Sequence, residues 1–178
     1  MEIVLVAPEI PHNTGCAARL AAALGLRLHL VQPLGFSLDD HYLKRAGLDY
    51  WPLVELVVHA SWDEFVTKSS RGARLRLFTA RGGTSLFETA FERDDVLVFG
   101  SESRGLPREL LDARPDRRVY VPIREGIRSL NLANVVCLAA YTAMVRAGIP
   151  LPANDGAYAP HARATEDVRP ASRIASDR

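Results

Sequence analysis

Residues 2–31 read EIVLVAPEIPHNTGCAARLAAALGLRLHLV, and they decide the fold class. The β-branched and leucine-rich run Glu2–Ala7 is closed by prolines, which is typical of a buried strand leaving a sheet. An alanine-rich segment then continues to Gly25, a residue type that commonly ends a helix, and Leu28–Val31 favours a second strand. The stretch therefore predicts one strand–helix–strand unit.

The same alternation continues along the chain. Further strands are expected at Val54–His59, Leu75–Thr79, Val96–Phe99 and Val119–Pro122, and further helices at Asp39–Ala46, Trp62–Lys68, Pro107–Asp112 and Asn131–Arg146. Strands that alternate with helices predict an α/β fold, in which a mostly parallel sheet carries helices on both faces.

Length and composition predict one domain followed by a tail. The chain has 178 residues, 48% of them hydrophobic, which is enough to close a single sizeable core at residues 1–150. Residues 151–178 are rich in Ala, Pro, Asp and Arg, and we expect them to be disordered because they bury too little apolar surface to offset their ordering entropy. The apolar runs are too short for a signal peptide or a membrane helix, which predicts a soluble, cytoplasmic protein.

Charge and cysteines narrow the function only slightly. A net charge of +1 excludes a global polycation, so any contact with RNA must come from a local basic patch. Such a patch is indicated between Arg104 and Arg128, where seven arginines stand against four acidic residues.

Cys16 and Cys137 have small or apolar neighbours in predicted helices, which favours buried free thiols over a disulfide. No metal site is expected, because no cluster of possible ligands has the spacing of a metal site.

The helix expected at Asn131–Arg146 has almost no polar face over four turns. A helix that is apolar most of the way round must be covered on most sides, and one sheet face cannot do this in so small a domain. We therefore expect the helix to pack against a partner subunit as well. The alternative is a central helix sandwiched by its neighbours within one monomer.

The first chemically suggestive loop is PHNTG, residues 11–15, which leads to Arg19. A glycine-containing turn after a parallel strand is where α/β proteins place ligands, so Asn13 is expected at the edge of a site. The Arg19 guanidinium could hold a phosphate or lie beside a hydroxyl whose proton must leave. The alternative is a helix capped by Asn13 or Thr14, with a solvated arginine.

The second loop, FGSESRGLP at residues 99–107, directly follows an apolar strand. Its two glycines and its proline build a tight turn in which the backbone can approach a ligand closely. Glu102 could accept hydrogen bonds and Arg104 could contact a phosphate. Gly-x-Gly-x-x-Gly and Gly-Lys-Ser/Thr motifs are absent from the sequence, which argues against nicotinamide and nucleoside triphosphate sites.

The third loop, VPIREGIRSLNLAN at residues 121–134, joins the last strand to the apolar helix. Ser129 or Asn131 can cap this helix. A cap does not explain why so many polar side chains precede so apolar a helix, whereas a phosphate-bearing partner does.

In this order and spacing, the three loops resemble the SPOUT class of RNA methyltransferases and, within it, the SpoU group that methylates ribose 2′-hydroxyls. Asn13-Thr14-Gly15 with Arg19 is similar to the first motif of the group, residues 99–107 to the second, and Ser129–Asn134 to the third. The resemblance covers residues 1 to about 150, and without an added N-terminal domain the chain is most similar to the minimal members, which act on the wobble nucleotide of tRNA. The departures are His12, Cys16–Ala18, Ser101, Ala133, Val135 and the long tail.

The resemblance implies a deep C-terminal trefoil knot, S-adenosyl-L-methionine bound in the knot loops, and a homodimer that completes each site. It places cofactor binding at Phe78, Thr79, Gly100, Val121, Ile123, Ser129 and Leu130. It places the active site at Arg19, Asn13, Glu102, Ser129 and Asn131.

The function so implied is S-adenosylmethionine-dependent 2′-O-methylation of tRNA, at a wobble cytidine or modified uridine. Arg19 would grip a phosphate that takes the hydroxyl proton, or would take the proton itself, and Asn13 would orient it. Glu102 would fix Arg19 or the loop, while Ser129 and Asn131 would hold the third loop and the ribose. The alternatives are another tRNA or rRNA site, a base methyltransferase of the same superfamily, and an RNA-binding protein without catalysis.

Overall fold

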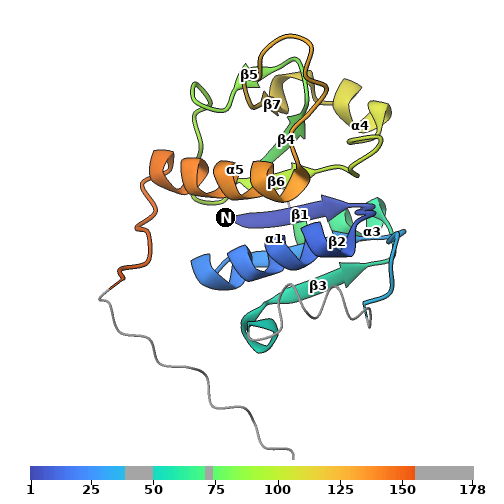
Figure 1. The fold of residues 1–178 in the computed structure, drawn as a ribbon, viewed down its shortest axis with the longest axis vertical. Coiled ribbons are helices and arrows are strands. Elements are labelled where there is room, and N and C mark those ends of the chain that lie inside the picture. The colour runs from blue at the N-terminus through green and yellow to red at the C-terminus, as the bar shows by residue number, and fades with distance from the viewer. Residues whose placement is uncertain (39–49, 71–73, 155–178) are drawn as a thin grey trace, which may run out of the picture.

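The structure is a computed structural model that describes residues 1–38, 50–70 and 74–154 (Figure 1). The helix predicted at Asp39–Ala46 and most of the predicted disordered tail at residues 151–178 lie outside the described residues. Within the described part of the chain, no helix is long and apolar enough to cross a membrane.

A seven-stranded sheet forms the centre of the molecule, with the order β3-β2-β1-β6-β4-β7-β5. Every recorded strand pair is parallel, which confirms the predicted parallel sheet. The strands are β1 (Glu2–Val6), β2 (Arg27–Val31), β3 (Leu56–His59), β4 (Leu75–Thr79), β5 (Thr84–Ser85), β6 (Val96–Phe99) and β7 (Arg118–Tyr120). Because β6 lies between β1 and β4, the loops that follow these three strands meet at one edge of the sheet.

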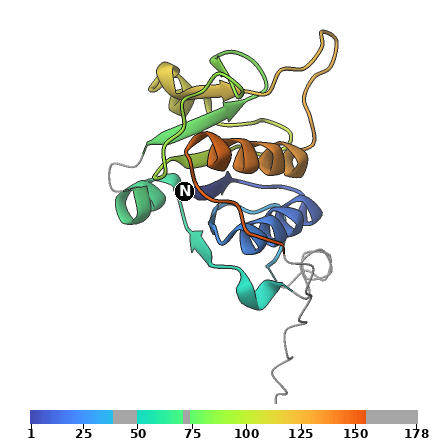
Figure 2. The same cartoon turned by 90° about the vertical axis from the view of Figure 1, so that its left-hand side faces the viewer.

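Helices cover both faces of the sheet, as the sequence predicts. On one face α1 (Pro11–Leu24) and α5 (Leu132–Arg146) lie side by side, and both views show this pair (Figures 1 and 2). The other face carries α3 (Trp62–Phe65), which continues into a π-helical turn, and α4 (Arg108–Asp112). Two short 3-10 helices occupy Trp51–Leu53 and Pro115–Arg117.

Two apolar cores separate the sheet from these two layers of helices. Alternate side chains of β1 enter different cores: Ile3 and Leu5 pack beneath α1 and α5, whereas Val4 and Val6 pack with Phe65 of α3. A strand buried on both faces is apolar at every position, which is why the central strands are continuous hydrophobic runs in the sequence. Each such side chain stabilises the fold by about 1.5–3 kcal/mol when fully buried.

The start of α1 differs from the prediction. The helix begins at Pro11, and Ile10 precedes it without a side-chain cap, so the predicted caps Asn13 and Thr14 are wrong. Proline suits the first helical position because an N–H at that position has no acceptor within the helix, so its absence from proline costs no helical hydrogen bond. At the other end Gly25 has φ 65° and ends the helix as predicted.

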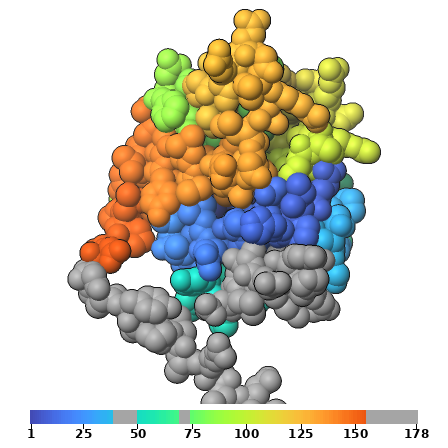
Figure 3. Space-filling view, in the orientation of Figure 1, coloured from blue at the N-terminus to red at the C-terminus, as the bar shows by residue number. Residues whose placement is uncertain are grey.

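The outer face of α5 is apolar and open to solvent within this chain. Val136, Ala140 and Met144 face the core, whereas Leu138, Tyr141 and Val145 are exposed, Val145 by 60%. The alternative of a helix sandwiched on all sides within one monomer is therefore wrong. α1 and α5 share one face of the molecule in the space-filling view (Figure 3).

The two cysteines are free thiols, but they are less buried than predicted. Cys16 is half-buried and Cys137 is exposed, because both lie on the sides of α1 and α5 that border a groove and not on the sides that face the sheet. The prediction of buried packing is therefore wrong for Cys137.

A buried polar cluster lies on the sheet away from the loops described below. The His29 ring is 2.9 Å from a nitrogen of His59 and 3.1 Å from a carboxylate oxygen of Glu2, and the edge of Phe65 packs against both rings. Burial and the neighbouring His29 lower the pKa of His59 from its ordinary value of 6.5. The hydrogen bond to His29 lowers the pKa of Glu2 from its ordinary value of 4.5.

Candidate active site

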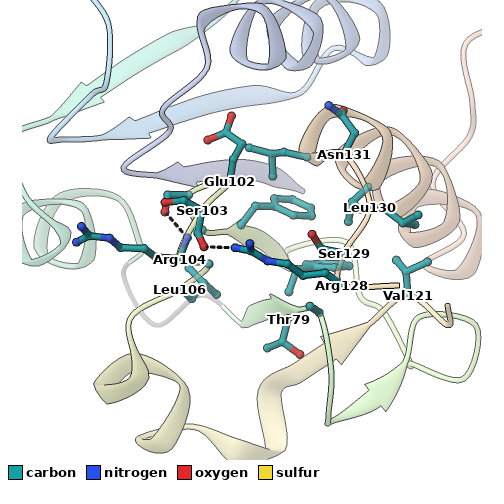
Figure 4. Close-up of a pocket in the computed structure, with 18 of the residues that line it drawn as sticks. Thr79, Glu102, Ser103, Arg104, Leu106, Val121, Arg128, Ser129, Leu130 and Asn131 are labelled. Carbon is teal, nitrogen blue, oxygen red and sulfur yellow. Dashed lines mark hydrogen bonds between the residues drawn. The ribbon is translucent and has the colours of Figure 1, made fainter. Parts of the chain in front are cut away.

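A cavity of about 510 Å³ opens where β4, β6 and β7 end, within the size range of small-molecule sites (Figure 4). The loops after these strands form its walls together with the start of α5. It is lined by all seven residues predicted for the cofactor: Phe78, Thr79, Gly100, Val121, Ile123, Ser129 and Leu130. These residues come from positions up to 52 apart in the chain, and the parallel sheet brings them together.

The inner wall of the cavity is apolar. Phe78 is the penultimate residue of β4 and Phe99 ends the neighbouring strand β6, and their rings stack with centroids 4.4 Å apart. Val121 and Leu106 are largely buried beside them. Such a wall suits the flat ring of a ligand, while the backbone groups at the strand ends remain available for polar contacts.

Gly100 is a position where the fold allows no side chain. A Cβ built there would lie 2.0 Å from the carbonyl carbon of Gly105, because the loop after β6 turns back on itself. Ser101 and Gly105 exchange backbone hydrogen bonds of 3.2 and 2.8 Å that close this turn, and Gly105 has φ 70°. The loop thus brings backbone, without a side chain in between, to the wall of the cavity.

Three of the predicted active-site residues form one hydrogen-bonded chain. The Asn13 Nδ2 group donates to Glu102 Oε1 over 2.9 Å, and Asn131 Nδ2 donates to Asn13 Oδ1 over 3.0 Å. Asn131 also caps α5 by accepting from the N–H of Asn134, which confirms it as the predicted N-cap. The chain therefore ties the first, second and third loops together at the edge of the cavity.

The Glu102 carboxylate also accepts two backbone N–H groups, from Glu9 over 2.8 Å and from Ile10 over 3.3 Å. The contact is reciprocal, because the Glu9 carboxylate accepts from the N–H of Ser103 over 3.0 Å and from its hydroxyl over 2.7 Å. Sequence reasoning missed Glu9. Its only signal was an acidic residue between two prolines, and that pattern does not show which loop it would meet.

Arg19 lies apart from this cavity. It lines a second groove of about 610 Å³ between α1 and α5, together with His12 and Cys16, and its guanidinium carbon is 4.8 Å from the ring centroid of Tyr50. Among the described residues, the structure does not bring Arg19 to the carboxylate of Glu102 or to the amide of Asn13. The two cavities nevertheless share Asn13 and Asn131 as lining residues.

Ser129 and Arg104 are exposed at the rim of the cavity. Ser129 is not the cap of α5, so its side chain remains available to a ligand. In the described part of the chain, no group of three or more His, Cys, Asp or Glu residues is arranged to hold a metal ion.

Fold and cavity define an α/β protein with a cavity of small-molecule size at the carboxyl ends of a parallel sheet, walled by three loops. The model of the SpoU rRNA Methylase family matches residues 1–141, and the chain belongs to this family. The resemblance drawn from the three loops is therefore confirmed.

Relatives with known names are similar over most of their length. A Burkholderia ambifaria protein named "tRNA (cytidine(34)-2'-O)-methyltransferase" is 49% identical over 148 residues, which cover 82% of this chain and 95% of that protein. A Bacillus subtilis protein named "Putative tRNA (cytidine(34)-2'-O)-methyltransferase" is 43% identical over 146 residues, which cover 81% of this chain and 91% of that protein.

Solved structures agree with the fold. One described as "Structural insights into the 2-OH methylation of C/U34 on tRNA" has a TM-score of 0.78 and 52% identity, and the match covers 82% of this chain and 94% of that one. The methyltransferase AviRb from Streptomyces viridochromogenes, solved with AdoMet, has a TM-score of 0.70 at 23% identity, with 82% of this chain and 60% of that chain covered. At this identity the likeness concerns the fold alone.

Proposed function

We propose that this protein is a cytoplasmic S-adenosylmethionine-dependent methyltransferase that methylates the ribose 2′-hydroxyl of nucleotide 34, the wobble nucleotide, in tRNA. The observation that carries the proposal is the single cavity that gathers all seven expected cofactor residues beside the Glu102–Asn13–Asn131 chain. The names of the relatives support the choice of nucleotide, and one solved relative is described for both C and U at that position.

The cavity fits the cofactor in size and chemistry. Apolar side chains at Phe78, Val121 and Leu130 suit the adenine ring, while the backbone at Gly100 and the hydroxyls of Thr79 and Ser129 suit its polar groups. S-adenosylmethionine, when bound, supplies an electrophilic methyl group on a positively charged sulfur.

The protein must position the ribose hydroxyl and help it to lose its proton, because a neutral hydroxyl is a poor nucleophile. Arg19 lies in the neighbouring groove, which Asn13 and Asn131 separate from the cavity. We assign Arg19 to the phosphate next to the target ribose, so that a phosphate oxygen accepts the proton while the guanidinium stays charged. Glu102 contributes indirectly, because its carboxylate fixes the amide of Asn13.

The proposal includes a folded domain at residues 1–150 whose C-terminal part is a trefoil knot. After β7, which pairs with β4 and β5, the chain crosses back to place α5 on α1 and beside β6. Passage of this returning segment through the loop after β6 would complete the knot, and the proposal is supported by the two loops lying together along the cavity.

The proposal also includes a homodimer. The exposed apolar residues Leu138, Tyr141 and Val145 follow one side of α5, and the groove that contains Arg19 lies between α5 and α1. A second copy that covers this face would bury the apolar stripe and bring further groups to Arg19.

The proposal is tested by methyl transfer from labelled S-adenosylmethionine to tRNA that lacks wobble methylation. Arg19→Ala is the test variant, and Arg93→Ala, which removes an exposed arginine outside both cavities and outside the basic segment 104–128, is the matched control. Digestion to nucleosides should place the label in a 2′-O-methyl nucleoside for wild type and control, with at least a 100-fold loss for Arg19→Ala, in the range of two to four orders of magnitude that proton transfer contributes. Label on a base, or cofactor binding without transfer to tRNA, would overturn the proposal.

A further inference from the structure

The loop of residues 121–131, which we call the cover loop, contributes six residues to the cavity wall: Val121, Ile123, Arg128, Ser129, Leu130 and Asn131. It contains one turn and no helix or strand, and most of its residues are exposed. A segment with so little buried surface is mobile unless specific contacts hold it. The contacts that hold the cover loop therefore decide how well its cavity-lining residues are placed.

One contact comes from the loop after β4. The guanidinium of Arg81 donates from Nη2 to the carbonyl oxygen of Ile127 over 2.9 Å. The loop that carries Arg81 is itself fixed, because the Thr79 hydroxyl lies 2.7 Å from the Arg81 carbonyl oxygen and 3.0 Å from that of Gly82. Arg81 thus links the cover loop to a wall that is already ordered.

A second contact reaches the opposite wall. Arg128 donates from Nη2 to the carbonyl oxygen of Ser103 over 2.7 Å, and Figure 4 shows its side chain extended toward Ser103. Ser103 is in turn held by the Glu9 carboxylate through its N–H and its hydroxyl. Adjacent residues, 127 and 128, are therefore fastened to two different walls of the cavity.

We propose that Arg81 and Arg128 form a clasp that holds the cover loop in place before the cofactor binds, and that this clasp sets the affinity for S-adenosylmethionine. The identity of the ligand rests on the proposed function. A loop that is already ordered loses less conformational entropy when a ligand binds, so binding is tighter. Both bonds have a charged donor, the stronger kind of hydrogen bond.

A different role for these arginines would be attraction of RNA phosphates through charge alone. Arg124 separates the two roles, because it lies in the same loop and is exposed, while the described structure records no hydrogen bond from its side chain. Arg124→Ala therefore removes the same charge as Arg128→Ala without removing the clasp.

The first experiment measures the mobility of the cover loop in the cofactor-free protein. A glutamate-specific protease cleaves after the exposed Glu125, and fragments are followed by mass spectrometry. We expect Arg81→Ala and Arg128→Ala to be cleaved at least about fivefold faster than wild type, and Arg124→Ala at the wild-type rate. Arg128→Lys should fall between these rates, since an ammonium group can still donate to a carbonyl oxygen.

The second experiment measures S-adenosylmethionine affinity by calorimetry without RNA, with thermal unfolding of each variant alongside. We expect about tenfold weaker binding for Arg81→Ala and Arg128→Ala, the loss of roughly one charged hydrogen bond, with Arg124→Ala unchanged and all midpoints close to wild type. Cleavage and affinity equal to those of Arg124→Ala would overturn the clasp. A wild type that does not bind S-adenosylmethionine would overturn the proposed function, while the cleavage rates would still test the clasp.

Discussion

The Glu102→Gln substitution probes the hydrogen-bonded chain at the centre of the candidate site. The Glu102 carboxylate accepts three N–H groups, from Glu9 and Asn13 over 2.8 and 2.9 Å and from Ile10 over 3.3 Å. A glutamine has nearly the same shape, but one oxygen becomes an NH2 group, which would face a donor. If the NH2 group replaces Oε1, Asn13 and the Ile10 N–H lose their acceptor; if it replaces Oε2, the Glu9 N–H does.

The magnitude follows from the kind of bond that is lost. A hydrogen bond to a charged group contributes about 1.5–3 kcal/mol, and Glu102 is half-buried, so solvent screening favours the lower end of this range. If the hydrogen-bonded chain mainly stabilises the transition state, the loss of this bond lowers kcat/KM about 10- to 30-fold.

The assay is the initial rate of methyl transfer over a range of tRNA concentrations, with Glu125→Gln as the matched control. Glu125 is exposed in the cover loop, and the described structure records no hydrogen bond to its carboxylate. The control should keep a rate within twofold of wild type. Equal rates for the two variants would refute the role of the Glu102–Asn13–Asn131 chain, provided that thermal unfolding shows both to be folded.

Three further predictions follow from the geometry. Gly100→Ala should abolish detectable S-adenosylmethionine binding and lower the free energy of unfolding by about 1–3 kcal/mol, because its Cβ would lie 2.0 Å from backbone. The control Gly25→Ala is strained but lies in open space, so it should lower the free energy of unfolding by about 1 kcal/mol and leave binding intact. Binding of S-adenosylmethionine by Gly100→Ala would contradict the prediction. We expect wild type to be a dimer by light scattering at micromolar concentration and Val145→Asp to be a monomer; a dimeric variant would exclude this face as the interface. The free energy of unfolding should be highest above pH 6.5, the ordinary pKa of His59, and should fall as the pH drops toward the lowered pKa of His59 in the folded protein. A second loss should begin below pH 4.5, the ordinary pKa of Glu2. Both losses arise because the unfolded chain takes up each proton at a higher pH than the folded protein does. His59→Gln should remove the first loss in a series of urea titrations, and an unchanged profile would count against the cluster.

The sequence predicts the strands well because the central ones are buried on both faces. Runs such as Val96–Phe99 are apolar throughout, and the loops that follow them carry the polar residues, so strands and candidate site could be located together. β5 was missed because it has two residues, too few for any periodicity.

Strand order and the contacts between loops could not be predicted in the same way. No local pattern places β6 between β1 and β4, yet that order is what brings Asn13 to Glu102 across 89 positions of the chain. The clasp of Arg81 and Arg128 binds carbonyl oxygens, which every residue has, so the sequence shows the arginines and not their partners.

The placement of Arg19 shows a second limit of reasoning from one chain. The sequence predicts Asn13 and Arg19 in one site, because they lie within two turns of the same segment. In the structure Asn13 turns to Glu102 and Asn131, while Arg19 lies over Tyr50 in the adjoining groove. The proposed homodimer, which would cover the α1–α5 face, would bring Asn13 of one subunit and Arg19 of the other into a shared site.

The most direct test of the central claim is to locate the methyl group on the RNA. An anticodon stem-loop is incubated with the protein and S-adenosylmethionine, end-labelled, and partially hydrolysed in alkali, a cleavage that requires a free 2′-hydroxyl. The account predicts a ladder with one missing band, at nucleotide 34, that depends on both cofactor and protein. A complete ladder after verified methyl transfer, or a gap at another nucleotide, would contradict it.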